Sequence, residues 1–495
     1  MQGGCMLDKT RSGGVLLHIT SLPNRQGIGT LGREAFDFID FMKAAELQVW
    51  QICPLGPTGY GDSPYQTFSA FAGNPLLIDL EGLLELGLLK KEEVAELSLL
   101  PVNRTDFGSL FRQKNKLLKQ AYERFRKNED YDEFCENNAF WLHEYALFMA
   151  LKDYFGGQAW NSWTPDIKLR KPLAMEHFSI SLLSEIDYYK FLQFIFDLQW
   201  EKLHRYASEQ GISIFGDIPI FVAFDSADAW SNRHLFYFDE NGNPTVVAGV
   251  PPDYFSATGQ LWGNPLYNWQ KMQENDFKWW QERFTHSLKM FDLIRVDHFR
   301  GFAGYWAVPA GEPTAVKGSW QPALGDELFK TLLHSLGEMP VVAEDLGVIT
   351  PDVTALRKKY GFPGMKILQF AFAGGESNPY LPHNYEENCV AYTGTHDNDT
   401  SVGWFRKISD AEKKYVCDYL HCAEADVCRS MIDSIWKSNA FLAVAPMQDF
   451  LELGSEARLN TPGVAAGNWQ WRMRKEQLDN CLVERIRNLN HESNR

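Results

Sequence analysis

Four acidic residues stand where short apolar runs of the sequence end. The run Phe-Gly-Asp ends at Asp217, Leu-Ile-Arg-Val-Asp at Asp297, Val-Val-Ala-Glu at Glu344, and Ala-Tyr-Thr-Gly-Thr-His-Asp at Asp397. Apolar runs of this kind are typical of strands that are buried on both faces. Any one of these acids, taken alone, is more simply explained as a helix cap or a solvated loop carboxylate. Four of them in one chain favour a catalytic cluster of carboxylates.

Two of these acids have different local surroundings, which predicts different chemical roles. Arg295 precedes Asp297 by two positions, and side chains two apart on a strand face the same way. The guanidinium should therefore lower the pKa of Asp297 and keep it ionised, as a carboxylate nucleophile requires. Glu344 has only Asp345 beside it, so its pKa should be raised, as a proton donor requires.

A carboxylate nucleophile paired with a carboxylic acid/base is the machinery of retaining glycosyl transfer, which passes through a covalent glycosyl-enzyme. For this chemistry the carboxyl groups of Asp297 and Glu344 should be about 5–5.5 Å apart. Asp397 cannot usefully repeat either role, so we expect it to hold sugar hydroxyls and favour a distorted ring. His298 and His396 follow and precede two of the acids and could donate hydrogen bonds to the same sugar.

The same histidines and acids could instead be metal ligands on a barrel. That kind of centre usually begins with His-x-His on the first strand, whereas the first apolar run here contains only His18. A lone histidine is more often a core or supporting residue than a ligand, and we predict no metal. We also predict no cofactor, because the sequence has neither a dinucleotide fingerprint nor a phosphate-binding loop.

The elements that must position these residues are eight apolar runs, most of them separated by helical patterns. The predicted strands cover residues 15–19, 49–55, 212–222, 293–297, 340–344, 365–370, 389–393 and 442–447. Strands that alternate with helices form right-handed parallel units, and eight of them match a (β/α)₈ TIM barrel of the α/β class. In such a barrel the active site lies at the carboxyl ends of the strands, where the four acids stand.

Long gaps between the strands indicate helix-rich insertions into one catalytic barrel that spans residues 1–495. Residues 60–210, after the second strand, contain several helical patterns, including 107–127 and 134–155. Residues 223–290, after the third strand, form a second insertion. Neither segment has repeats or low complexity, so we predict two ordered subdomains.

The bulk composition argues against several classes of function. A formal net charge of −16 and the lack of basic runs disfavour nucleic acid, which needs Lys and Arg to neutralise its phosphates. Apolar runs fall short of the roughly 18 residues that span a bilayer, and the amino terminus lacks the apolar stretch of a signal peptide. We therefore predict a cytoplasmic protein without membrane attachment.

Cysteine spacing and aromatic content refine this picture. The eight cysteines have no Cys-x-x-Cys spacing and are predicted to be reduced structural thiols, with zinc at Cys417, Cys422 and Cys428 a minor alternative. Aromatic residues make up 14% of the chain, which exceeds what a core usually takes. Most of them belong to the core, and the surplus offers platforms for the apolar faces of sugar rings.

Taken in order, the motifs resemble those of the amylomaltases, the 4-α-glucanotransferases related to the α-amylase clan. The resemblance runs from residue 18 to residue 472 and so covers nearly the whole chain. It rests on Gly-Tyr-Gly-Asp-Ser-Pro-Tyr at 59–65, Gly-Asp-Ile-Pro-Ile at 216–220, Arg-Val-Asp-His-Phe-Arg-Gly at 295–301, Ala-Glu-Asp-Leu-Gly at 343–347 and Gly-Thr-His-Asp-Asn-Asp at 394–399.

The resemblance assigns roles to individual residues. It implies that Asp297 is the nucleophile, Glu344 the acid/base and Asp397 the stabiliser of the transition state. The residues that it implies in contact with the reacting glucose are Tyr60, Asp217, Arg295, His298 and His396.

The resemblance also implies a lid over residues 249–265. Glycines and prolines at both ends of this segment enclose Tyr254, Phe255 and Trp262, a composition that suits a moving loop. A transferase must favour a sugar hydroxyl over water, and aromatic residues that close over the acceptor groove would exclude water from the glycosyl-enzyme.

The implied reaction moves an α-1,4-glucan segment from a donor maltooligosaccharide to the 4-hydroxyl of an acceptor glucan or glucose, as in glycogen, starch or maltodextrin metabolism. Two alternatives stay open at this point. One is an α-glucan hydrolase that uses the same three carboxylates with water as acceptor. The other is a non-catalytic glucan-binding barrel, in which the acids would be dispensable.

Overall fold

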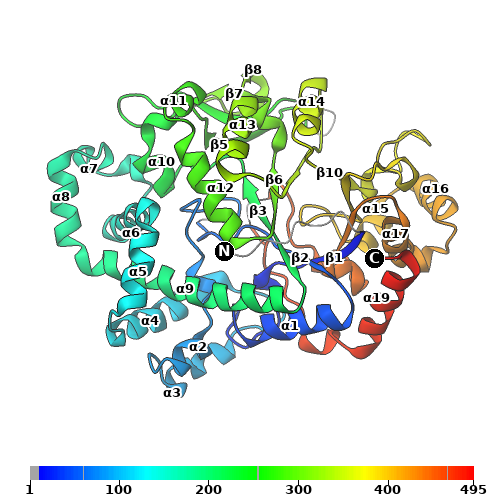
Figure 1. The fold of residues 1–495 in the computed structure, drawn as a ribbon, viewed down its shortest axis with the longest axis horizontal. Coiled ribbons are helices and arrows are strands. Elements are labelled where there is room, and N and C mark those ends of the chain that lie inside the picture. Colours follow the sequence, from blue (N-terminus) through cyan, green and yellow to red (C-terminus); the bar gives the residue numbers. More distant parts are fainter. Residues whose placement is uncertain (1–10, 60, 253–255, 465) are drawn as a thin grey trace.

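Eight parallel strands form a nearly closed barrel at the centre of the molecule (Figure 1). The computed structural model describes residues 11–59, 61–252, 256–464 and 466–495. In spatial order the strands are β10 (Gly364–Ile367), β11 (Cys389–Tyr392), β12 (Leu442–Pro446), β1 (Ser12–Leu16), β2 (Val49–Gln51), β3 (Ser213–Pro219), β6 (Leu293–Asp297) and β9 (Val341–Ala343). Each overlaps one of the eight predicted runs, so the predicted (β/α)₈ barrel is confirmed.

The barrel interior follows from the alternation of side chains along the strands. Every strand contributes to one buried apolar cluster, which includes Leu16, Val49, Phe215, Leu293, Val342, Met365, Val390 and Leu442. Residues two apart on a strand face the same way. The next positions on that inward face are therefore Asp217 on β3, Arg295 and Asp297 on β6, and Glu344 just past β9. The apolar cluster thus forms the floor beneath the four polar groups.

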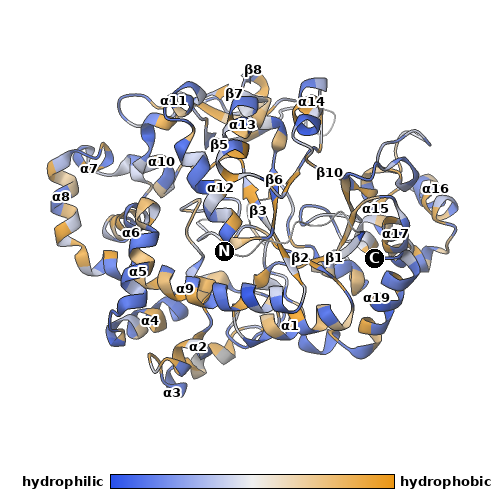
Figure 2. Cartoon of the chain, in the orientation of Figure 1, coloured by the Kyte–Doolittle hydropathy of each residue, from blue (hydrophilic) through white to orange (hydrophobic). Residues whose placement is uncertain are grey.

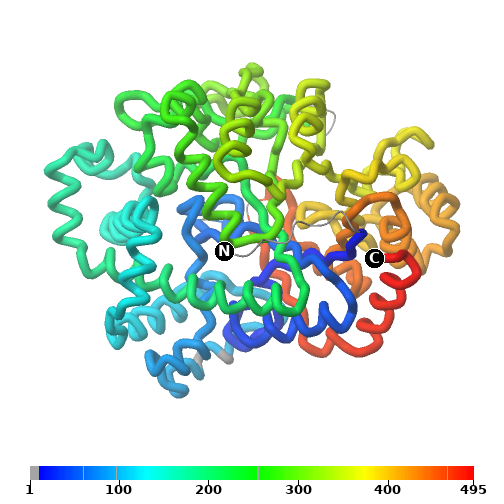
Figure 3. Tube along the Cα trace, viewed as in Figure 1, coloured from blue at the N-terminus to red at the C-terminus, as the bar shows by residue number. Residues whose placement is uncertain are grey.

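Helices cover the outside of the barrel. They are α1 (Arg33–Ala44), α12 (Lys278–Met290), α13 (Gly325–Leu336), α14 (Pro351–Lys359), α15 (Ser401–Lys407), α16 (Asp410–Leu420), α17 (Val427–Lys437), the short α18 (Met447–Phe450) and α19 (Asn480–Ser493). The C-terminal α19 lies beside α1 (Figure 3). Asn490 Nδ2 on α19 donates to the backbone oxygens of Ala45 and Glu46 at 2.9 Å each. In the described part of the chain, no helix combines the length and the apolar character needed to cross a bilayer.

The segment between β2 and β3 is helical and projects to one side of the barrel (Figure 1). Its helices are α2 (Leu80–Glu85), α3 (Lys91–Val94), α4 (Phe107–Arg124), α5 (Glu129–Asn137), α6 (Ala139–Tyr154), α7 (Pro165–Lys168), α8 (Pro172–Ser181) and α9 (Leu183–Glu209). The long α9 leads back to β3. Lys114 on α4 is fully buried, and its Nζ donates to the Leu76 oxygen at 2.7 Å, which ties the helices to the segment after β2.

A second, antiparallel sheet lies over one edge of the barrel, in the order β5 (Gln260–Pro265), β4 (Val246–Val250), β7 (Gly304–Pro309) and β8 (Ser319–Pro322). The helices α10 (Ala227–Ser231) and α11 (Trp269–Glu274) flank its first two strands in the sequence. Sequence analysis did not predict this sheet, and it placed no excursion after β6. Strand β8 gives no apolar signal because all four of its residues are exposed, and the buried Val247 of β4 and Val308 of β7 meet only through the pairing of those two strands. Their pairing depends on contacts between distant segments.

Strands β9 and β10, the two ends of the sheet order, are joined by side-chain and backbone hydrogen bonds at the seam of the barrel. The Ala343 N–H donates to the Pro363 oxygen at 2.8 Å. Asp345 Oδ1 accepts from the Met365 N–H at 2.8 Å, and Asp345 Oδ2 lies 3.2 Å from Arg357 Nε on α14. A Cβ at Gly364 would come within 2.4 Å of the Asp345 carboxylate. Asp345 therefore fixes the loop that carries Glu344.

We predict that Asp345→Ala lowers the free energy of unfolding by about 1–3 kcal/mol, because it leaves the Met365 N–H unpaired and removes one partner of Arg357. Asp345→Asn retains an oxygen that can accept from Met365 and should lose less. Denaturant unfolding of the two variants and the parent measures the difference. Equal stability of all three proteins would show that Asp345 does not hold this seam.

Candidate active site

Arg295 is the centre of a buried ion-pair cluster near the carboxyl end of β6. Its Nη2 donates to Asp297 Oδ1 at 2.5 Å, and its Nη1 donates to Asp217 Oδ2. The pairing of β3 with β6 places Asp217 directly opposite Arg295. The side chains of Arg295 and Asp217 are 5% and 1% exposed, whereas that of Asp297 is 28% exposed. The cluster therefore holds Asp297 within reach of a ligand, with one oxygen engaged by a cation.

Tyr65 links this cluster to His396. Its hydroxyl donates to Asp217 Oδ2 at 2.8 Å, and its ring stacks on the imidazole of His396 with centroids 5.0 Å apart. The Trp469 ring packs against both, with centroids 5.9 Å from Tyr65 and 5.8 Å from His396. A continuous set of contacts therefore leads from Asp217 to the loop after β11.

Glu344 is held by two backbone N–H groups. Its Oε2 accepts from the His298 N–H at 2.8 Å, and its Oε1 accepts from the Leu346 N–H at 3.1 Å. Burial raises the pKa of Glu344 to about 8, with the nearby Asp297 carboxylate as the second cause. Asp345, which the sequence analysis offered as the cause, has a smaller effect than either. Glu344 is therefore protonated at neutral pH.

His298 connects Glu344 to the antiparallel sheet. Its backbone has φ = 51°, in the left-handed region that few residues other than glycine adopt, and this turn directs its N–H at Glu344. Its imidazole meets the Trp262 ring of β5 edge-on at 4.8 Å, and Phe221 lies 6.4 Å away between ring centroids. Burial lowers the pKa of His298 to about 4, so the ring is neutral at neutral pH.

Asp397 is positioned from the C-terminal part of the chain. Asn460 Nδ2 donates to its Oδ1 at 2.6 Å, and Arg458 Nη2 donates to its backbone oxygen at 2.7 Å. His396 Nε2 lies 3.4 Å from its Oδ2. The Asp397 side chain is 44% exposed, against 28% for Asp297, so its Oδ2 is accessible to a ligand.

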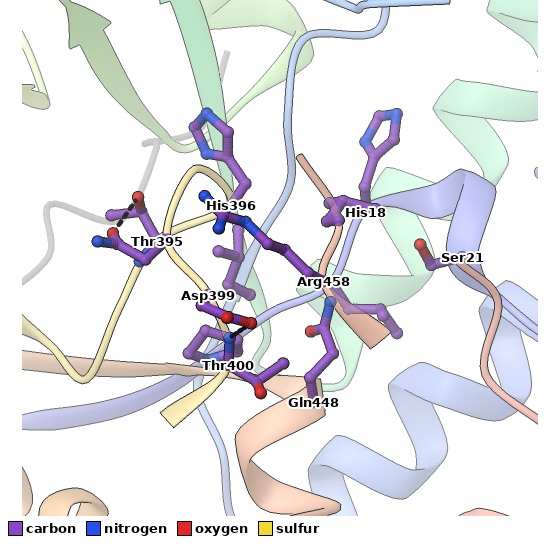
Figure 4. Close-up of a pocket in the computed structure, with 13 residues that line it drawn as sticks. His18, Ser21, Thr395, His396, Asp399, Thr400, Gln448 and Arg458 are labelled. Atoms are coloured by element: carbon purple, nitrogen blue, oxygen red, sulfur yellow. Dashed lines mark hydrogen bonds between the residues drawn. The ribbon is translucent and has the colours of Figure 1, made fainter. Parts of the chain in front are cut away.

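A small cavity of about 20 Å³ lies beside His396 (Figure 4). Its polar lining includes His18 at the end of β1, Ser21, Gln448 and Arg458. Burial, with a contribution from His396, lowers the pKa of His18 to about 3. His18 is therefore a neutral, buried neighbour of the site. Among the described residues, no group of three or more His, Cys, Asp or Glu side chains is arranged to hold a metal ion.

The structure brings most of the predicted site residues into this one network. Three of them, Tyr60, Tyr254 and Phe255, lie outside the described residues. Sequence analysis missed Tyr65, Arg458, Asn460 and Trp469. Tyr65 and Trp469 had a signal, because Tyr65 ends the segment 59–65 and Trp469 lies in the segment 468–472, both of which carried the resemblance. Arg458 and Asn460 follow β12 and reach the site only through the fold, which no local pattern reports.

A parallel barrel with three acids gathered at the carboxyl ends of its strands has the architecture of a barrel enzyme that works through carboxylates. The family model described as 4-alpha-glucanotransferase matches residues 17–478. The 4-alpha-glucanotransferase of Synechocystis sp. is 50% identical over 96% of this chain and 96% of its own length. That of Thermus thermophilus is 49% identical over 95% and 96%. The chain therefore belongs to the 4-α-glucanotransferase family.

Solved structures agree with this assignment. The amylomaltase from Streptococcus agalactiae, determined in complex with acarbose, is 40% identical, with a TM-score of 0.96 over 98% of this chain and 100% of that one. The amylomaltase from Corynebacterium glutamicum, 19% identical, shares the fold with a TM-score of 0.79 over 98% of this chain and 74% of its own. The protein is thus an enzyme of the glycosyl-transferring kind.

The raised pKa of Glu344 predicts a pH-dependent effect of Glu344→Gln on stability. Between the ordinary carboxyl pKa near 4.5 and the folded-state pKa of about 8, the folded protein binds a proton that the unfolded chain has released. Stability contributed by this group therefore falls as pH rises through that window. Glutamine has no such dependence, so the variant's melting temperature should rise relative to the parent's between pH 4.5 and 8.

Thermal unfolding of both proteins at a series of pH values measures this difference. The variant also changes the two backbone hydrogen bonds of Glu344, but this changes the melting temperature by the same amount at every pH. A difference in melting temperature that stays constant from pH 4.5 to 8 contradicts the raised pKa. In an Asp297→Asn background the upper end of this window should fall to lower pH while its lower end stays near 4.5, because the second cause of the raised folded-state pKa is removed.

Proposed function

We propose that the protein transfers an α-1,4-glucan segment from a donor maltooligosaccharide to the 4-hydroxyl of an acceptor glucan or glucose, with retention of configuration. The observation that carries this proposal is that two acids of the site are bound by different groups. Asp297 is bound by a guanidinium, whereas Glu344 is bound by backbone N–H groups and is protonated at neutral pH. Asp297 is therefore suited to act as the nucleophile, and Glu344 to act as the proton donor.

In the first step the Asp297 carboxylate attacks C1 of a donor glucose. Because Arg295 engages Oδ1, we assign the attack to Oδ2. The bond from C1 to the glycosidic oxygen breaks, and that oxygen takes the proton of Glu344 as it leaves with the remainder of the donor. The product is a covalent glycosyl-aspartate and an ionised Glu344.

In the second step the acceptor's 4-hydroxyl enters where the leaving group was. It gives its proton to Glu344 as its oxygen bonds to C1, and Asp297 departs as a carboxylate. Two inversions at C1 restore the α configuration. The pKa of about 8 suits Glu344 to both directions of proton transfer near neutral pH.

The remaining predicted contacts surround the reacting glucose in this proposal. Asp397, held by Asn460 on one oxygen, binds sugar hydroxyls through the other and stabilises the distorted ring. Asp217 and Arg295 offer a fixed carboxylate and guanidinium, and the neutral rings of His298 and His396 supply hydrogen-bonding nitrogens. Tyr60 is assigned to the same glucose by the family resemblance.

We further propose that residues 249–265 act as a lid, with Tyr254, Phe255 and Trp262 facing the acceptor. The support is that Trp262 already touches His298, which in turn holds Glu344. The proposed lid begins in β4 and ends in β5, so both of its ends are anchored in the antiparallel sheet. The segment between the two strands can then close over the site while the barrel stays in place.

We place this reaction in the cytoplasm. The cysteines of the described residues, Cys53, Cys135, Cys389, Cys417, Cys422, Cys428 and Cys481, are all free thiols. Free thiols in this number are typical of a reducing compartment.

Incubation with maltotriose alone tests the transferase proposal. We expect a ladder of longer maltooligosaccharides together with glucose, detected by chromatography. Asp297→Asn should lower product formation by about 10⁴-fold or more, because the covalent step loses its nucleophile. Shortened products without a ladder would identify a hydrolase instead, and an active Asp297→Asn protein would refute the assigned nucleophile.

The lid proposal predicts that Trp262→Ala raises the ratio of hydrolysis to transfer severalfold, because water reaches the glycosyl-enzyme more readily. Reducing-end release, compared with ladder formation from maltotriose, measures this ratio. Trp320→Ala is the matched control, since Trp320 lies on β8 of the same sheet and is 42% exposed. The same ratio in the Trp262 variant and the parent would remove Trp262 from the lid.

A further inference from the structure

Helix α8 lies at the outer edge of the helical insertion (Figure 1), and much of it carries hydrophobic residues (Figure 2). Residues of α8 are at most half-buried. Leu173 and Ile180 are 82% and 71% exposed, and Leu183, just past the helix, is 60% exposed. Apolar groups that gather on one surface usually mark an interaction site. The proposed transferase mechanism uses none of them.

The two faces of α8 differ in what they contact. Ala174, Met175 and Phe178 face the insertion, and the Phe178 ring lies 5.3 Å from Tyr154 and 6.1 Å from Phe155 between centroids. The opposite face follows from helical spacing, since residues three and four apart lie on one side. That face consists of Leu173, Glu176, His177 and Ile180, and all four are exposed.

The exposed face is self-complementary. Leu173 and Ile180 stand at equal distances from the midpoint between Glu176 and His177. When two copies of α8 pair antiparallel about a two-fold axis at that midpoint, Leu173 faces Ile180 of the second copy. Glu176 then faces His177 of the second copy. Both contacts occur twice, as a two-fold symmetric interface requires.

The charge distribution favours contact at this place. The whole chain has a formal net charge of −16, so two copies repel each other over most of their surfaces. Between residues 171 and 183 the ionisable side chains are Lys171, Glu176 and His177. The segment therefore combines low net charge with exposed apolar groups.

We propose that the exposed face of α8 is a self-association surface, which joins two copies of this chain through an antiparallel helix pair. At about 1.5 Å per residue the helix is about 15 Å long, and such a pair buries less than the roughly 1,200–2,000 Å² of a standard stable interface. The dimer is therefore weak and reversible, and it forms as protein concentration rises.

Sedimentation equilibrium over a wide range of protein concentration tests this proposal. We expect a mass that rises from one chain towards two. Leu173→Glu should weaken association at least about tenfold, because it replaces a buried apolar contact twice in each dimer. Leu99→Glu is the matched control, because Leu99 lies elsewhere in the same insertion and is 85% exposed. It should associate like the parent. Melting temperatures near the parent's verify that both variants fold.

A charge swap tests the antiparallel geometry itself. Glu176→Lys places a lysine opposite His177, and His177→Glu places two glutamates opposite each other, so each single change should weaken the dimer. The double variant Glu176→Lys, His177→Glu places a lysine opposite a glutamate in both contacts and should restore association. A monomer at every concentration, a dimer insensitive to Leu173→Glu, or a double variant weaker than both single variants would overturn the proposal.

Discussion

The buried guanidinium of Arg295 is the interaction on which the site depends. Removing a cation from water costs several kcal/mol, and here two carboxylates, Asp217 and Asp297, offset that cost. The arrangement requires β3 and β6 to be neighbours in the register that sets Asp217 opposite Arg295. A slip of one residue would turn the guanidinium out of the barrel. The closed barrel therefore specifies the catalytic geometry as well as the fold.

The two reacting acids differ in the groups that bind them. Asp297 accepts a hydrogen bond from Arg295, whereas Glu344 accepts hydrogen bonds from two backbone N–H groups, and both residues are half-buried. Desolvation and the nearby Asp297 carboxylate raise the pKa of Glu344, so its proton affinity is set by groups that the fold brings to it. The position of Glu344 depends in turn on Asp345, which fixes the seam between β9 and β10.

Elements outside the barrel complete the site with single side chains. The segment after β2 supplies Tyr65, the antiparallel sheet supplies Trp262, and the chain after β12 supplies Asn460 and Trp469. Each of these side chains contacts a site residue that lies at the end of a barrel strand or in the loop after it. This division leaves the outer part of the helical insertion free for other contacts, of which the exposed face of α8 is the one we propose.

The sequence by itself determined the barrel and its acids. Local patterns include the eight apolar runs, the two-residue alternation and the acids at the ends of the runs. Runs that are buried on both faces are typical of parallel strands. Asp217, Asp297, Glu344 and Asp397 were found this way. The sheet of β4, β5, β7 and β8, the contacts of Tyr65 and Asn460, and the cause of the raised pKa of Glu344 were decided only by the tertiary structure. Each depends on groups distant in the chain, and pairing, hydrogen bonding and desolvation act on neighbours in space, which a linear pattern does not record.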